Sequence, residues 1–197
     1  MNTVLNYAFY FFFYSVAGWI LETVCCSLYY RKIANRGFLK GPVCPIYGTA
    51  AVVLGVCLMP FYDNFGYTWY IIPIVILLGV VIANTVEFLT SYVMEKLFNA
   101  RWWDYSNEFL NIQGRICLKH SIYWAICTGI FIYIIHPFVV KQTHNLLTNE
   151  QRNIILVVAL IIFSIDLIFT LIAAKKKKLR NTVTVKKETQ ESTKQSK

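Results

Sequence analysis

Five stretches of the sequence are long and apolar enough, or nearly so, to cross a lipid bilayer as helices. They lie at residues 5–24, 43–59, 69–90, 116–135 and 154–173, and the second is the shortest. A helix that crosses the hydrocarbon core needs about 20 mostly apolar residues. The sequence therefore predicts an all-α, multi-pass membrane protein with about five transmembrane helices, and we expect residues 1–174 to form its transmembrane domain.

The composition narrows the class further. Apolar residues make up 57% of the chain and charged residues only 15%, against about 45–50% and about 25% in soluble domains. These values exclude a disordered chain and an ordinary soluble enzyme. They also argue against a nucleic-acid partner, despite a formal net charge of +9. We expect the lipid bilayer of the cell membrane to be the chain's immediate partner.

The basic residues indicate how the chain is oriented. All of the 19 Lys and Arg residues except Lys141 and Arg152 lie in three regions: the loop after the first stretch, the region from the end of the third stretch to Lys119 at the start of the fourth, and the C-terminal tail. Because Lys and Arg accumulate on the cytoplasmic side, the pattern predicts the N-terminus outside and the C-terminus inside. Residues 175–197 are polar and lack apolar periodicity, so we expect a disordered cytoplasmic tail. Contact of this tail with lipid headgroups is the alternative role of its charge.

Several polar residues interrupt the apolar stretches, where an ionisable group costs about 2.5–3.5 kcal/mol. In the predicted orientation they all lie in the cytoplasmic half, which predicts a polar cluster or a cavity open to the cytoplasm. With the polar residues of the two loops, the candidate binding residues are Glu22, Arg36, Asn84, Glu87, Asp104, Asn111, Arg115, His120 and Asp166. The alternative is structural pairing of Glu22 or Glu87 with Arg36, Arg101 or Arg115.

The two predicted cytoplasmic loops are rich in residues that restrict the backbone. Glycine permits positive φ and proline blocks helix continuation, so we expect the chain to become helical only after Pro45 and the first loop to pack against the polar cluster. Paired tryptophans in the second loop suit the membrane interface. The residues predicted to shape these loops are Asn35, Gly37, Gly41, Pro42, Pro45, Tyr47, Gly48 and Trp103.

The sequence contains no clear motif for metal binding, disulfide formation or catalysis. The six cysteines have no spacing typical of a metal site or a disulfide framework, so we expect no metal and no cofactor. No pairing of a nucleophile with a base stands out, and we assign no catalytic residue. Three function classes stay open: a transport-associated protein, a membrane scaffold or regulatory protein, and a membrane-embedded enzyme that modifies lipids. Catalysis is the weakest of the three.

Long motifs in the first four stretches resemble a known family. Gly18-Trp19 with Glu22, then residues 35–39, 41–42 and 45–48, then Glu87, residues 102–106 and residues 114–118, are similar to the small bacterial membrane proteins described as putative ABC-transporter type IV, or CmpB-like. The resemblance covers roughly residues 7–130 and leaves out the fifth stretch. It implies a permease subunit that acts as a homo-oligomer or with a separate ATPase chain, since no phosphate-binding G-x-x-x-x-G-K-[ST] loop is present.

Overall fold

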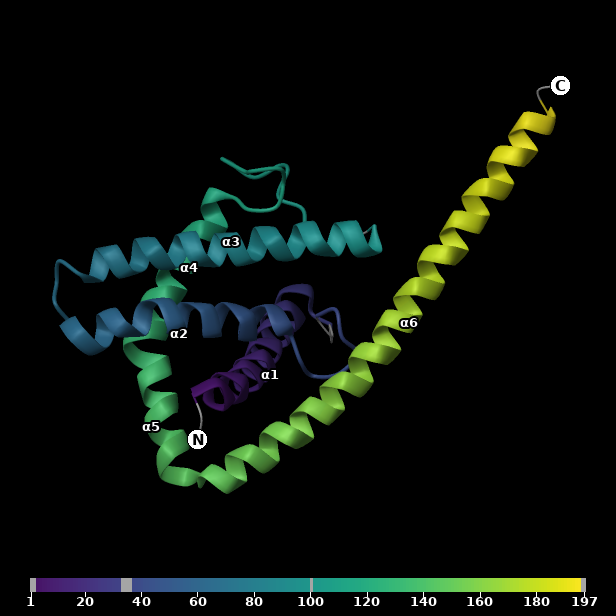
Figure 1. The fold of residues 1–197 in the computed structure, drawn as a ribbon. Coiled ribbons are helices and arrows are strands. Elements are labelled where there is room, and N and C mark those ends of the chain that lie inside the picture. Colours follow the sequence, from purple (N-terminus) through teal and green to yellow (C-terminus); the bar gives the residue numbers. More distant parts are fainter. Residues whose placement is uncertain (1–2, 33–36, 100, 196–197) are drawn as a thin grey trace.

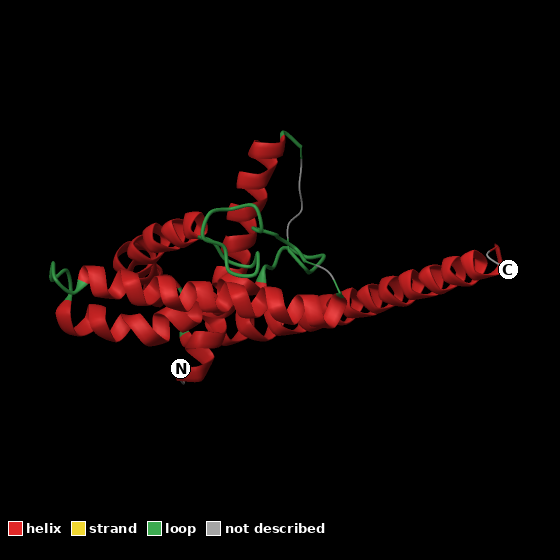
Figure 2. Cartoon of the chain, turned by 90° about the horizontal axis from the view of Figure 1, so that it is seen from above, coloured by secondary structure: helices red, strands yellow, loops and turns green. Residues whose placement is uncertain are grey.

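A computed structural model describes residues 3–32, 37–99 and 101–195, with side chains as far as Lys176 and without that of Tyr30. The helices are α1 (Thr3–Tyr30), α2 (Pro45–Phe65), α3 (Ile72–Phe98), α4 (Leu118–Ile130), the π-helical turn η1 (Phe131–Ile135), α5 (His136–Leu146) and α6 (Asn149–Gln195). The described residues form no strand (Figure 2), which confirms the all-α prediction.

Five helical segments are long and apolar enough to cross a membrane: Thr3–Tyr29, Pro45–Phe65, Ile72–Phe98, Leu118–Leu146 and Asn149–Lys176. This confirms the predicted number of transmembrane helices. Each segment reaches past one or both ends of its apolar stretch, because helical hydrogen bonding continues into the polar residues that flank it. α2 begins at Pro45, directly after Cys44 in an extended conformation, as the prolines of the first loop predict.

Successive helices pack against one another from α1 to α4, and we call α1 with α2 the first hairpin and α3 with α4 the second. Figure 1 shows α2 and α3 side by side and α6 leaving the other helices. Loop 1, residues 31–44, joins α1 to α2, and loop 2, residues 99–117, joins α3 to α4. Small residues bring the paired helices close: Gly18 lies against the Tyr47 ring, and Gly79 lies against Thr128. At Gly48 an added Cβ would overlap the Ser15 hydroxyl and the backbone of α1. Such contacts let helices pack where no hydrophobic effect draws them together.

Two apolar clusters join the hairpins. Leu54 and Leu58 of α2 pack with Val75 of α3 and with Ile132 and Tyr133 of η1. A second cluster gathers the aromatic face of α1 against α2 and the fourth span. There the Tyr14 hydroxyl and His136 Nδ1 are hydrogen-bonded at 2.9 Å, so the fourth span is held to α1 as well.

The π-helical turn in the fourth span has an identifiable cause. Pro137 has no backbone N–H, so the carbonyl group four residues earlier, that of Tyr133, loses its regular helical donor. The Tyr67 hydroxyl donates to this carbonyl at 2.8 Å. The chain thus keeps a buried backbone oxygen hydrogen-bonded while the helix widens by one residue and continues into α5.

The last helix leaves the rest of the protein. α6 crosses the N-terminal half of α1, where Phe163 packs edge-on against Phe11 and Phe12. It then extends past loop 1 (Figure 1). Most of its apolar side chains are exposed, as expected of a helix that faces lipid. The disorder predicted for residues 175–197 stays a prediction.

Candidate functional site

Loop 2 is held in a defined conformation by hydrogen bonds between its own residues. Trp103 donates its Nε1 proton to the Arg115 carbonyl at 3.0 Å, and the Tyr105 backbone N–H donates to the Gly114 carbonyl at 2.8 Å. Gly114 has a φ of +67°, which favours glycine. The Asn111 amide donates to the carbonyl oxygens of Ser106 and Glu108, so this predicted binding residue shapes the loop.

The Asp104 carboxylate also forms hydrogen bonds within loop 2. It accepts from the Ser106 backbone N–H at 3.0 Å and from the Ser106 hydroxyl. These hydrogen bonds lower the pKa of the Asp104 carboxyl below its ordinary value. The carboxylate is thus ionised and engaged in a tight turn.

Arg115 turns back from loop 2 towards α3. Its side chain is only 7% exposed, donates to the Ser91 hydroxyl at 3.0 Å and forms an ion pair with Glu95 at 2.5 Å. Arg101 pairs with the same carboxylate at 3.2 Å. The structural pairing considered for these arginines therefore exists, but its acid is Glu95 rather than Glu22 or Glu87.

Glu87 lies two turns from Glu95 on the same face of α3 and is 5% exposed. Its two carboxylate oxygens accept from different elements: Oε1 from the Tyr105 hydroxyl at 3.1 Å, and Oε2 from Trp124 Nε1 on α4 at 2.9 Å. Within the described residues, no Lys, Arg or His nitrogen lies within 4 Å of this carboxylate. Glu87 is thus a buried acid held by neutral donors.

His120 completes this group of side chains. Its ring stacks on Tyr105 with ring centres 4.1 Å apart, and its Nδ1 lies 3.1 Å from Cys117 Sγ. Burial raises the pKa of Tyr105, and the negative charge of Glu87 raises it further, so Tyr105 remains a protonated donor. We call Glu87, Tyr105, His120 and Trp124 the Glu87 network.

Asn84 lies one turn from Glu87 and points to α4. Its amide nitrogen donates to the Ser121 hydroxyl at 2.8 Å, while its oxygen Oδ1 is buried without a hydrogen-bond donor among the described residues. A buried amide oxygen without a donor carries a desolvation cost. It is a free acceptor one helical turn from the network.

Glu22 on α1 lies at the entrance of α2. Its carboxylate accepts from the Cys44 thiol, with sulfur and oxygen 3.8 Å apart, and Tyr47 lies close enough to interact with it. Burial, and then the charge of Glu22, raise the pKa of Cys44 to about 12. Glu22 also acts electrostatically on Tyr105, which places it near the Glu87 network.

Asp166 on α6 binds loop 1. Its carboxylate accepts from the backbone N–H groups of Lys40 at 3.3 Å and Gly41 at 2.9 Å. An added Cβ at Gly41 would lie 3.0 Å from the carboxylate, so glycine permits the close approach. A shallow pocket of about 490 Å³ lies beside this contact. No described hydrogen bond or ion pair joins Asp166 to the Glu87 network.

The predicted polar residues thus form separate groups of contacts. Tyr105 links Glu87 to His120, with Glu22 and Asn84 nearby, whereas Asp166 binds loop 1, and Asp104, Asn111 and Arg115 stabilise loop 2. Asn35 and Arg36 lie outside the described residues. In loop 1, Gly37 has a φ of +113° and Pro42 is exposed. As predicted, loop 1 packs against some of the acids, since it contacts the half-buried Glu22 and Asp166.

Sequence reasoning identified neither Trp124 nor Tyr105 as a partner of Glu87. The sequence did indicate that such donors should exist, because a buried Glu87 needs hydrogen-bond donors on the helix that faces it. Nothing in a single sequence states which of several aromatic residues on α4 points at it.

A comparison with protein families supports the resemblance seen in the motifs. A family model described as "Putative ABC-transporter type IV" matches residues 9–171. The match includes most of the fifth span, so the expectation that the resemblance ends near residue 130 was wrong. Comparisons with curated proteins and with solved structures gave no match.

Proposed function

Because the chain belongs to the family described as "Putative ABC-transporter type IV", we propose that it is a membrane subunit of a transport system. It works as a homo-oligomer or together with a separate ATP-hydrolysing chain. Its N-terminus lies outside the cell and its C-terminus inside. Loops 1 and 2 then face the cytoplasm, and the Glu87 network lies beneath them as the binding site for the transported species.

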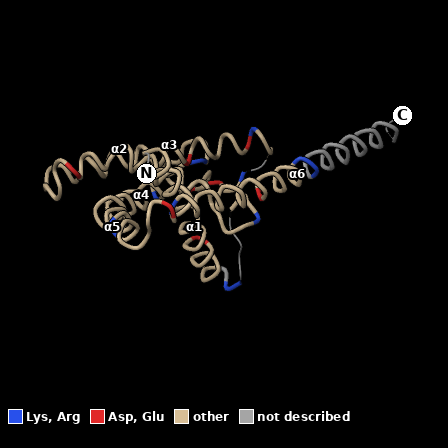
Figure 3. Tube along the Cα trace, turned by 60° about the horizontal axis from the view of Figure 1, so that its bottom comes forward, with Lys and Arg blue, Asp and Glu red and all other residues tan. Residues whose placement is uncertain are grey.

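The distribution of charge supports this orientation. Figure 3 shows Lys and Arg at loop 1, at loop 2 and on α6 at the last of its described side chains, while the helices between are largely uncharged. The positive-inside tendency favours a cytoplasmic position for these loops.

One observation carries the binding proposal: Glu87 is a buried carboxylate that no cation neutralises within the described residues, although Arg115 and Arg101 lie two turns away on Glu95. Acids inside a span are costly and mark pathways for ions or polar substrates. A protonated amine or a proton would supply the missing positive charge. Tyr105, His120 and the free Asn84 oxygen would provide hydrogen bonds around it.

A scaffold role is the second candidate, and a specific observation favours it. Both Glu87 oxygens are already hydrogen-bonded, one to loop 2 and one to α4, so the carboxylate also fastens the second hairpin. A purely structural network would fix helix packing and bind nothing.

Two variants separate the candidates. Glu87→Gln keeps the shape and an acceptor but removes the charge, and Glu95→Gln removes a structural ion pair on the same helix. We expect Glu87→Gln to reach wild-type abundance in the membrane yet fail to complement a deletion strain. Failure of Glu87→Gln to accumulate in the membrane, or its full complementation of the strain, would favour the scaffold.

The subunit proposal has its own test. Affinity purification of the tagged chain from native membranes in mild detergent, followed by mass spectrometry, should recover an ATPase subunit. If only the chain itself is recovered, and gentle crosslinking before extraction adds no ATPase, the assignment to an ABC system is wrong.

A further inference from the structure

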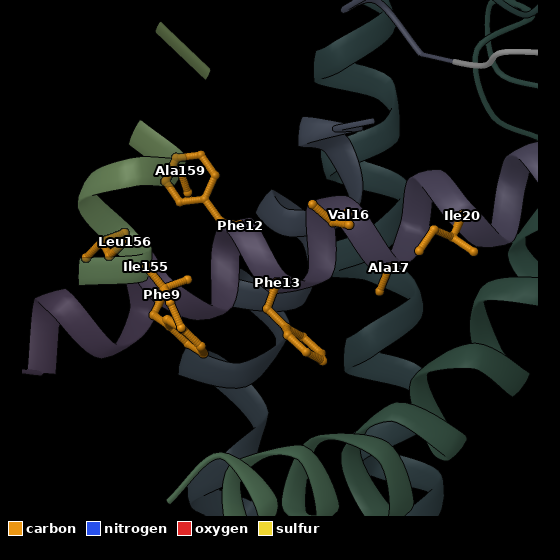
Figure 4. A pocket seen from close by; sticks show the side chains of 9 residues that line it. All are labelled: Phe9, Phe12, Phe13, Val16, Ala17, Ile20, Ile155, Leu156 and Ala159. Carbon is orange, nitrogen blue, oxygen red and sulfur yellow. The ribbon is translucent and has the colours of Figure 1, made fainter. Parts of the chain in front are cut away.

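A groove of about 390 Å³ runs along the outside of α1 and is walled at one end by α6. Figure 4 shows Phe9, Phe13 and Ile20 succeeding one another along α1, with Leu156 and Ala159 reaching in from α6 near Phe9. Every lining side chain is apolar. Phe9 and Leu156 are buried where the two helices meet, whereas Phe13 and Ile20 are exposed.

Two polar residues lie beyond the end of the groove that is nearest the N-terminus of α1. Asn6 precedes Phe9 and Phe13 on one face of α1, and Arg152 precedes Leu156 and Ala159 on one face of α6, by helical spacing. The two polar residues meet across the gap, where Arg152 Nη1 donates to Asn6 Oδ1 at 3.3 Å. Neither residue lines the groove, and each lies about one helical turn beyond its nearest lining residue, Phe9 or Leu156.

Arg152 lacks a counter-charge. It is 3% exposed, its Nη2 donates to the Asn149 side chain, and its Nε is buried with no acceptor among the described residues. No Asp or Glu oxygen in the described part of the chain lies within 4 Å of it. A buried cation held only by neutral amides is poorly compensated, and an anion would complete both its charge and its hydrogen bonds.

The dimensions fit a lipid. Phe9 and Ile20 are eleven residues apart on α1, which corresponds to about 16 Å along the helix. One leaflet contributes about 15 Å, half of the hydrocarbon core. The groove is therefore about as long as an acyl chain extends into one leaflet. Arg152 lies at the depth expected of the lipid headgroup.

We propose that this groove binds an anionic phospholipid, with an acyl chain along α1 and the phosphate at Arg152. The lipid belongs to the leaflet at the N-terminal end of α1, away from loops 1 and 2. The proposal rests on Arg152 and the groove alone, and it holds or fails independently of any transport function.

The test uses the full chain reconstituted in bilayers of equal parts phosphatidylglycerol and phosphatidylcholine. Lipids that stay bound after release from the bilayer are counted by native mass spectrometry. We expect enrichment of phosphatidylglycerol on the wild type. Arg152→Gln, which keeps hydrogen bonds to the asparagines, should lower this enrichment about fivefold, and Arg152→Lys should retain most of it.

A second variant keeps the test decisive if Arg152→Gln fails to fold. Ala17→Trp fills the groove from a lipid-facing position and leaves the charge in place, so it should reduce bound lipid of both kinds. Equal retention of the two lipids by the wild type would overturn the proposal. So would unchanged enrichment in a folded Arg152→Gln protein, or unchanged lipid binding in Ala17→Trp.

Discussion

The indole of Trp124 donates its Nε1 proton to Glu87 across 2.9 Å, so this side-chain hydrogen bond, like that from Asn84 to Ser121, joins the third and fourth spans inside the membrane. Lipid offers no substitute donor at that depth. The second hairpin therefore depends on an interaction between one acid and one aromatic residue, in addition to its packing.

Removal of that donor should destabilise the protein measurably. We expect Trp124→Phe to cost about 1–3 kcal/mol, because a buried charged acceptor loses one of two donors. Thermal unfolding in detergent would report the loss as a lower Tm. Trp69→Phe is the matched control, since that residue is 80% exposed, and an equal change in both variants would contradict the role of the hydrogen bond.

Two glycines on α2 should respond in opposite directions to the same substitution. A Cβ at Gly48 overlaps the Ser15 hydroxyl and the Phe11 carbonyl, so Gly48→Ala should cost about 1–3 kcal/mol through overpacking. A Cβ at Gly55 meets only His136, at 3.7 Å, and alanine there should gain up to about 1 kcal/mol of helix propensity. Thermal unfolding of both variants gives the signs, and a stabilised Gly48→Ala protein would refute the close packing of α1 on α2.

Cys44 should react slowly with thiol reagents, and its reactivity should depend on pH. Its pKa is raised to about 12, so little thiolate exists at pH 8, and the labelling rate should keep rising up to that pKa. Single-cysteine proteins carrying Cys44 or the exposed Cys25 can be compared with a charged maleimide. Glu22→Gln should speed labelling at Cys44, since the neighbouring negative charge disappears. An unchanged rate would mean that Glu22 does not face the thiol.

Asp166 should protect the backbone of loop 1 from exchange. Its carboxylate binds two successive N–H groups, whereas the amide of Asp166→Asn offers only one oxygen. Hydrogen–deuterium exchange should therefore accelerate in the peptide containing Lys40 and Gly41, with loop 2 unchanged. Uniform acceleration across both loops would indicate general unfolding instead.

The helical architecture could be predicted well, and the contacts within the site only partly. Long apolar stretches cross a membrane as helices, because each backbone polar group must then be hydrogen-bonded within its own segment. The partners of each acid depend on helix rotation, which periodicity does not determine when a helix is apolar all round. Glu87 was therefore identified as important while its donors Tyr105 and Trp124 were not, and Asp166 was grouped with residues it does not touch.

The fourth span shows the same limit. A boundary at residue 135 follows from hydropathy, because Pro137 and Lys141 end the apolar pattern. The helix nevertheless continues to Leu146, because Tyr67 supplies the hydrogen bond that Pro137 cannot. That donor lies 66 residues away in the sequence, which local patterns do not reveal.

The π-helical turn at Phe131–Ile135 also sets a rule for how this chain can change length. A π-turn holds one residue more than regular α-helix, so removal of a single residue there would restore the regular helix and keep both flanking faces in phase. Removal of one residue from α4 would instead rotate His136 by about a quarter turn or more relative to the start of the span, away from Tyr14. Natural variants that are one residue shorter in this span should therefore carry the gap between residues 131 and 135.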